Sequence, residues 1–251
     1  NPRIKFTTVD LGAYEVQTQD LTQSTWRGYN YNWDSVINWC GGYIPLATTN
    51  VTIPTGVTNY PVISSTANSK NLLLANGSSI GLTNSGQINI NGNYTNNGSI
   101  ITNNGTWIMA GSTASQTFPG TAATVNAMNN LEIKNASGIA FDKSFSITGS
   151  LIPTAGNIDV NNVEVTLKSS DTLTASVDVI QAAASISYTG TGSFIVERFI
   201  NTGLSAGQHQ KTWQFLATPT TGQTIYQSWQ ESGNTPAGFG TWVTGTGTGF
   251  D

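Results

Sequence analysis

The central part of the chain carries apolar residues in pairs whose members are two positions apart, and these pairs recur every eight residues. The first pairs are Leu72/Leu74, Ile80/Leu82 and Ile88/Ile90. Residues two positions apart lie on the same face of a β-strand, so the pattern predicts short strands that each bury one face. The same spacing returns later in Leu131/Ile133, Ile139/Phe141, Phe145/Ile147, Ile158/Val160 and Val163/Val165/Leu167.

The segments between the predicted strands have the composition of turns. Ala75-Asn76-Gly77 and Asn84-Ser85-Gly86 separate the first pairs, and residues 94–98 are nearly repeated in residues 101–105. An antiparallel sandwich with tight Asn-Gly hairpins is one architecture with this spacing. We favour the other, a parallel β-solenoid, because the period is short and regular and stacked coils would align Asn and Thr in ladders.

The composition supports an all-β class and excludes some partners. Asp, Glu, Lys and Arg make up 9% of the chain, against about 25% in ordinary soluble proteins. Solubility therefore comes from Thr, Ser, Asn and Gly, which suit strands and turns better than helices. The net charge is −4 with only 9 basic residues, which argues against a nucleic-acid partner. No apolar run is long enough to span a membrane.

Several short motifs resemble those of large surface proteins of Bacteroidetes. Asp10-Leu11-Gly12-Ala13-Tyr14-Glu15 resembles the closing motif of their right-handed parallel β-helix domains, and Asn38-Trp39 resembles the opening of a following module. Similar segments lie at residues 51–54, 93–98, 194–198, 213–219 and 229–231. The resemblance implies export by the type IX secretion route, contact with the secretion and anchoring machinery of the outer membrane, and a role in adhesion, gliding or a surface layer. Some members of the family are enzymes that carry such modules as appendages.

These observations predict four segments along the chain. Residues 1–20 would end a preceding β-helix module, 21–45 would form an aromatic-rich cap or linker, 46–191 the β-solenoid, and 192–251 the start of a following β-rich module. The chain begins at Asn1 without an initiator methionine and stops at Asp251, so we expect an internal piece of a longer protein.

Catalytic and metal chemistry find little support in the sequence. His209 is the only histidine and Cys40 the only cysteine, so the usual zinc ligand set cannot form, and no Gly-x-Ser-x-Gly motif is present. Neighbouring acids such as Asp159/Glu164 could form a glycosidase pair, but sparse carboxylates on a polar surface are usually solvated. We therefore expect no enzyme, catalytic residue, cofactor or metal, and we expect Cys40 to be a small buried side chain, with pairing to another chain as the alternative.

The aromatic cluster near the N-terminus has two interpretations. Trp26, Tyr29, Tyr31 and Trp33 could stack on sugar rings and are candidate glycan-binding residues. We favour the other interpretation, a cap that hides the first coil from water and from edge pairing.

Two short motifs resemble the Asp-Ser/Thr-apolar pattern at which Bacteroidetes attach O-linked glycans. They are Asp34-Ser35-Val36 and Asp171-Thr172-Leu173, which makes Ser35 and Thr172 candidate glycan carriers. The sequence as a whole therefore predicts an extracellular structural or adhesive segment on the cell surface, with polysaccharide or neighbouring surface proteins as partners. A carbohydrate-binding module, or an appendage of a polysaccharide-degrading enzyme, is the alternative.

Overall fold

The computed structural model describes residues 4–5, 8–9, 20–120, 127–199 and 222. The chain divides into two compact units, residues 1–200 and 201–251. Strands β1 (Ile4–Lys5) and β2 (Thr8–Val9) form a short antiparallel pair. Most of the predicted modules at 1–20 and 192–251 lies outside the described residues.

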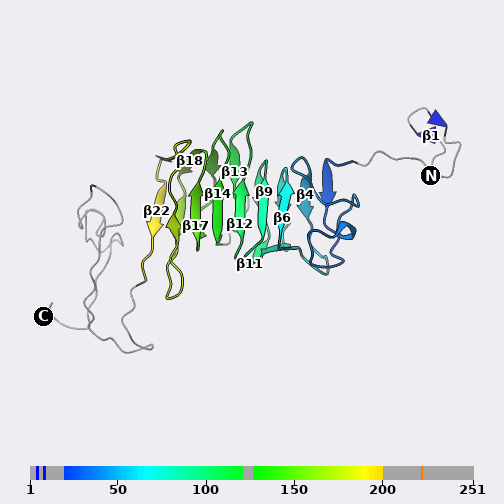
Figure 1. The fold of residues 1–251 in the computed structure, drawn as a ribbon, viewed down its shortest axis with the longest axis horizontal. Helices are drawn as coiled ribbons and strands as arrows, with labels where there is room; N and C mark the ends of the chain where they lie inside the picture. The colour runs from blue at the N-terminus through cyan, green and yellow to red at the C-terminus, as the bar shows by residue number, and fades with distance from the viewer. Residues whose placement is uncertain (1–3, 6–7, 10–19, 121–126, 200–221, 223–251) are drawn as a thin grey trace. The chain divides into compact units, whose positions relative to one another are not determined.

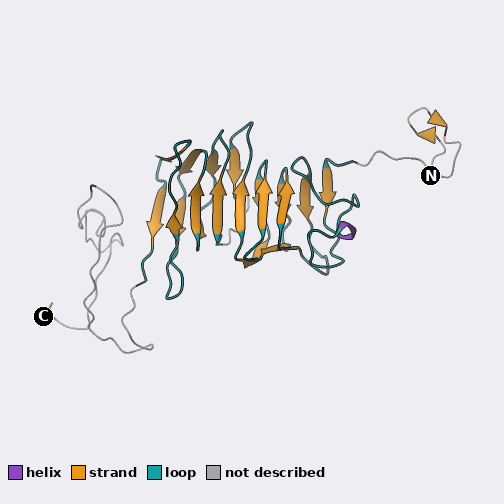
Figure 2. Cartoon of the chain, viewed as in Figure 1, coloured by secondary structure: helices purple, strands orange, loops and turns teal. Residues whose placement is uncertain are grey.

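Residues 20–120 and 127–199 form a parallel β-solenoid, which confirms the predicted fold class (Figure 1). The chain winds through three faces in each coil, and strands on the same face of successive coils pair in parallel. The short helix η1 (Val36–Asn38) is the only helix among the described residues, and it lies beside the first coil (Figure 2). The hairpin alternative is excluded because the strands of the solenoid pair in parallel.

The strands fall into three groups, one for each face. The first face holds β3 (Gln23–Thr25), β4 (Asn50–Ile53), β7 (Leu72–Leu74) and β10 (Tyr94–Asn96), followed by β13 (Gln116–Phe118), β15 (Ile139–Phe141), β18 (Gly156–Asn161) and β21 (Ala184–Thr189). The second holds β5 (Val62–Ile63), β8 (Ser79–Leu82) and β11 (Ser99–Asn103), followed by β16 (Phe145–Ile147), β19 (Glu164–Leu167) and β22 (Ser193–Val196). The third is one continuous six-stranded sheet of β6 (Thr66–Ser69), β9 (Gln87–Ile90), β12 (Thr106–Met109), β14 (Asn130–Ile133), β17 (Ser150–Pro153) and β20 (Ser176–Val177). The ladder is continuous on the third face, whereas the first and second faces are each divided into two sheets, between β10 and β13 and between β11 and β16.

The apolar pairs of the sequence fill the interior of the coils. Leu72 and Leu74 are buried, whereas Leu73 between them is 36% exposed. The eight-residue recurrence corresponds to the three sides of one coil, because the second and third pairs fall in β8 and β9 on the next two faces. The register stacks like side chains from coil to coil, as in the column Ile88, Trp107, Leu131 and Leu151 of the third face.

An asparagine ladder runs along the corner that precedes the first face. Asn71 Nδ2 donates to Asn50 Oδ1 at 2.8 Å, and the side chains are 21 residues apart in sequence. Asn71 Oδ1 in turn accepts from the backbone N of Asn93 at 2.7 Å, 22 residues further along. Asn93 Oδ1 continues the series by accepting from Thr117 N at 3.0 Å. Each side chain thus satisfies polar groups of the adjacent coil, which fixes the register between coils.

The parallel pairing extends beyond the range 46–191 at both ends. Strand β3 pairs with β4, and β22 pairs with β19. The sequence of β3 is entirely polar, yet its central Ser24 is 3% exposed and points inward. A small polar residue at an inward position carries no apolar signal, so the first coil could not be recognised from periodicity.

Aromatic side chains fill the middle of the solenoid. The rings of Tyr94 and Phe118 stack at 5.3 Å between centroids, and Phe118 meets Phe145 edge-on at 5.6 Å. Tyr94 is 0% exposed, and its hydroxyl has no hydrogen-bond partner. Burial raises the pKa of this phenol far above its ordinary value, so the group stays neutral.

Replacing Tyr94 by Phe is expected to stabilise the protein by about 1 kcal/mol, because it removes a buried hydroxyl that has no partner while keeping the ring. The urea midpoint of unfolding measures the change. Tyr60→Phe is the matched control, because the Tyr60 hydroxyl donates to the Gly77 carbonyl at 3.0 Å and its removal should be neutral or mildly destabilising. A lower midpoint for the Tyr94 variant than for its parent would contradict the expectation.

Candidate functional site

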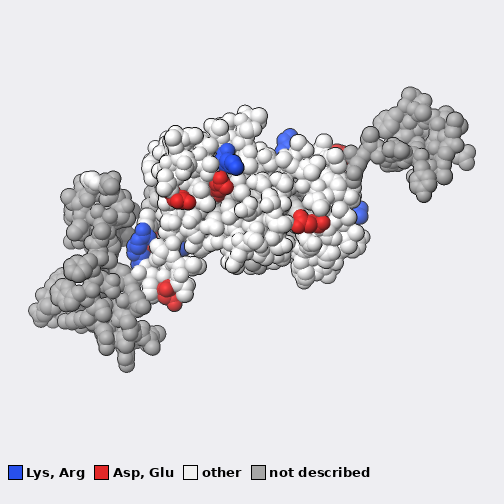
Figure 3. Space-filling view, viewed as in Figure 1, with Lys and Arg blue, Asp and Glu red and all other residues white. Residues whose placement is uncertain are grey.

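Two acidic side chains of the solenoid, Glu132 and Asp159, bond hydroxyl groups. Figure 3 shows that charged groups are few on the face in view and that most of this face is uncharged. Glu132 on β14 accepts from Thr154 Oγ1 at 2.8 Å, and Asp159 on β18 accepts from Thr189 Oγ1 at 2.9 Å. These two carboxylates lie on different faces and each bonds a hydroxyl of a neighbouring segment. Their contacts are those of structural side chains.

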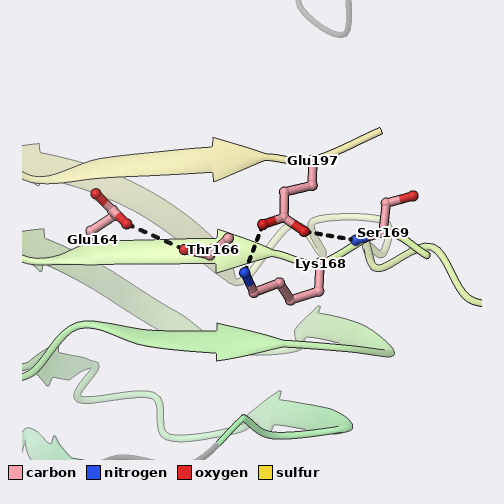
Figure 4. A network of polar contacts seen from close by, with 5 residues as sticks. All are labelled: Glu164, Thr166, Lys168, Ser169 and Glu197. Atoms are coloured by element: carbon pink, nitrogen blue, oxygen red, sulfur yellow. Dashed lines mark hydrogen bonds and ion pairs between the residues drawn. The ribbon is translucent and has the colours of Figure 1, made fainter. Parts of the chain in front are cut away.

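One ion pair is present among the described residues, and it joins the last two coils (Figure 4). Lys168 Nζ donates to Glu197 Oε1 at 2.6 Å, and the backbone N of Ser169 donates to Glu197 Oε2 at 3.2 Å. The bond from Lys168 holds the pKa of Glu197 below its ordinary value. Glu164, the first residue of β19, instead accepts from Thr166 Oγ1 at 3.3 Å. The network fastens β22 to β19 and brings no second carboxylate to the lysine.

Asp142 has a pKa above its ordinary value. Partial desolvation raises the pKa of Asp142, and the adjacent Lys143 lowers it in part. The nearest acid before it in sequence, Glu132, has its carboxylate engaged with Thr154. His209 lies outside the described residues.

Two of the four candidate glycan-binding aromatics are buried in the first coil. Trp26 is 1% and Trp33 0% exposed, and both pack on Trp39 with centroid distances of 5.0 and 4.6 Å. Trp26 and Trp33 therefore cannot stack on a sugar, because no ring face reaches solvent. Their burial has a physical cause, since large apolar rings cover the interior of the first coil. Tyr29 and Tyr31 are 65% and 58% exposed, so these two rings are accessible.

A buried amide organises the loop that carries the exposed tyrosines. Asn38 is 0% exposed, and its Nδ2 donates to Asn30 Oδ1 at 2.7 Å and to the Asn32 carbonyl at 2.8 Å. Its Oδ1 accepts from the backbone N of Asn30 at 3.0 Å. Gly28 (φ 75°) fits closely against the second coil, where Asn59 Nδ2 donates to its carbonyl at 2.9 Å. These bonds fix the loop on both sides.

An open pocket of about 470 Å³ lies against this loop. Its walls are Arg27, Tyr29, Val36, Ile37, Trp39 and Gly42. Arg27 is the only charged residue in the lining, and Val36 and Ile37 present exposed aliphatic surface from η1. Sequence analysis did not identify Arg27, Val36 or Ile37 as site residues, because only the folding of the 27–38 loop brings them together.

The remaining candidate residues lie on the surface of the solenoid. Ser35 is half-buried beside η1, and its hydroxyl accepts from Asn30 Nδ2 at 3.4 Å. Thr172 is exposed in a tight turn, where its backbone N donates to Ser170 Oγ at 3.3 Å. Thr172 is therefore the more accessible of the two proposed glycan carriers. The expectation that Cys40 is buried is wrong: the thiol is free and exposed because the residue lies on the outer side of the first coil.

The described residues contain no grouping of three or more His, Cys, Asp or Glu side chains suited to a metal ion. Within the same residues, no helix has the length and apolar character needed to cross a bilayer. Comparison of the chain with protein-family models, with curated proteins and with solved structures found no match.

Proposed function

We propose that this chain is a structural or adhesive segment of a large extracellular protein on a cell surface, and that it carries no catalytic site. The observation that supports the proposal is the unbroken parallel ladder of the third face, six strands long, over a buried apolar interior. Each coil stacks only on its neighbours, so such a solenoid holds its two ends at a fixed separation. A segment that spaces or presents other parts of a protein needs this property.

The surface of the solenoid fits the same role. Its outward side chains are mostly uncharged hydroxyls and amides, several of them engaged between coils as in the Asn50–Asn71–Asn93 series. Interactions between uncharged groups change little with ionic strength, unlike those between exposed charges. A surface segment that experiences variable salt would benefit from that composition.

The location and the partners rest on the sequence resemblance. They comprise export across the outer membrane by the type IX route, contact with its secretion and anchoring machinery, and adhesion to polysaccharide or to neighbouring surface proteins. Antibody labelling of intact cells that produce the protein tests the location. Labelling that appears only after the cells are permeabilised would refute an extracellular site.

The absence of catalysis is tested by incubating the full chain with a panel of polysaccharides and measuring new chain ends. We expect no release above that of the heat-denatured chain. Release of ends would overturn the structural proposal and direct attention to Asp142 and the other acids.

A second candidate function is carbohydrate binding, either by an independent module or by an appendage of a polysaccharide-degrading enzyme. The observation that favours it is the pocket of Arg27 and Tyr29, where an exposed aromatic ring lies beside a cation. Retention of the chain on a polysaccharide without release of chain ends would support this function over a purely structural one.

A further inference from the structure

We propose that the pocket beside the first coil binds acidic sugar residues, with Arg27 recognising the carboxylate and Tyr29 the ring of a uronate unit. The inference rests on the carbohydrate-binding candidate function and names its ligand class. The proposed site keeps Tyr29 from the four aromatics identified in the sequence and leaves out Trp26 and Trp33, because both are buried.

The charge of the pocket selects an anion. Arg27 is exposed, and no carboxylate pairs with it among the described residues. Its Nη2 makes two long contacts with Cys40, at 3.4 Å with the carbonyl oxygen and at 3.8 Å with Sγ, and these leave most of the five guanidinium donors unused. A planar guanidinium matches a carboxylate in a two-pronged geometry that an ammonium cannot reproduce.

The rest of the lining selects a ligand with an apolar face. Tyr29 is 65% exposed, and Val36 and Ile37 are 48% and 56% exposed on η1. A pyranose ring presents C–H groups that pack on an aromatic face, and a uronate carries its carboxylate at the edge of that ring. The pocket therefore offers a surface for the ring beside a cation for the acid.

The backbone around the pocket disfavours an acidic peptide as the ligand. An extended peptide that adds as a strand binds through free backbone groups of the protein. Here Arg27 N donates to the Asn38 carbonyl at 2.6 Å, Cys40 N to Thr25 at 2.9 Å, and Gly42 N to Trp39 at 3.0 Å. These donors are already used, so recognition must come from side chains, as in sugar binding.

The loop is held in place before any ligand arrives. Asn38 and Asn59 fix it from two sides through the bonds described above, and Trp39 Nε1 donates to the Trp33 carbonyl at 2.8 Å beneath it. A loop that is already ordered loses less conformational entropy on binding, which favours measurable affinity for a short oligosaccharide.

The test is calorimetric titration of the full chain with a short oligogalacturonate and with the same oligosaccharide after its carboxyl groups have been reduced. We expect binding of the acidic form only, and an affinity that falls as salt is added. Arg27→Gln should weaken binding about tenfold, the loss expected for one charge-assisted hydrogen bond. Tyr29→Ala should weaken it as well. Lys134→Gln is the control, because it removes the same charge from an exposed site after β14 and should leave the affinity unchanged.

The other possible results distinguish failure of the acidic-sugar inference from failure of the carbohydrate-binding function. Equal binding of the acidic and reduced oligosaccharides would overturn the acidic-sugar inference but keep the carbohydrate-binding function. No binding of either sugar would overturn both and leave the structural role. Loss of affinity in Lys134→Gln equal to that in Arg27→Gln would show nonspecific charge attraction and refute the pocket. Binding of an acidic peptide of the same charge, with no sugar binding and with loss in Arg27→Gln, would replace the sugar by a peptide. Circular dichroism of each variant confirms that the solenoid is intact.

Discussion

Replacing Ile90 by Asp is expected to unfold several coils of the solenoid at room temperature. Ile90 is 0% exposed in β9 and stacks between Ser69 of the preceding coil and Met109 of the next. The substitution removes a buried aliphatic side chain and places a carboxylate among apolar neighbours, which together cost on the order of 5 kcal/mol or more. That cost is comparable to the whole stability of a typical domain.

The loss should spread along the solenoid, because a coil has no contacts other than those with its neighbours. Far-ultraviolet circular dichroism and urea unfolding measure the effect, and hydrogen exchange shows which coils lose protection. Ile101→Asp is the matched control, since Ile101 is 56% exposed at an irregularity of β11 and the same change there should alter stability by about 0.5 kcal/mol or less. If the Ile90 variant unfolds at the same urea concentration as the parent, the stacked interior is not as described.

Gly156→Ala is expected to destabilise the protein by about 3 kcal/mol or more. Two effects add up in this loss, a strained backbone and a steric clash of the new Cβ. Gly156 has a φ of 84°, and a Cβ there would lie 1.9 Å from the carbonyl oxygen of Asn135. That oxygen cannot move freely, because it accepts from Gly138 N at 2.8 Å and the Asn135 side chain is itself buried.

Gly56→Ala separates the two causes. Gly56 has a similar φ of 77°, but no atom lies within 4 Å of the position its Cβ would take. It should therefore show only the backbone term, about 1 kcal/mol. Thermal or urea unfolding of both variants gives the difference. Equal losses at the two positions would mean that Asn135 and Gly156 are not in close contact.

The interior of the solenoid could be predicted because it is periodic. Leu72 and Leu74 flank an exposed leucine, and buried apolar pairs at the same spacing return in β8 and β9, so the strands could be predicted from the spacing of these pairs. The first coil could not be predicted from the spacing of apolar residues. Ser24 points inward without an apolar side chain, and the chain then leaves the coil in the loop that ends near Asn38.

The candidate pocket could not be predicted for the same reason. In the 27–38 loop, the direction of each side chain depends on the hydrogen bonds of Asn38 and not on the alternation of a β-strand. Sequence composition could show that aromatics gather there, but it could not separate the buried Trp33 from the exposed Tyr29. The ring that a ligand can reach is decided by packing, which only the folded chain reveals.

The continuous sheet of the third face also sets a fixed length along the solenoid. Adjacent strands are about 4.8 Å apart, so its six strands extend over roughly 24 Å. Because the strands of this face pair in the same way from one coil to the next, gain or loss of one coil would change the length of the sheet by a single strand spacing. Evolution could thus adjust the reach of such a segment in even steps, by duplicating or deleting stretches of one coil.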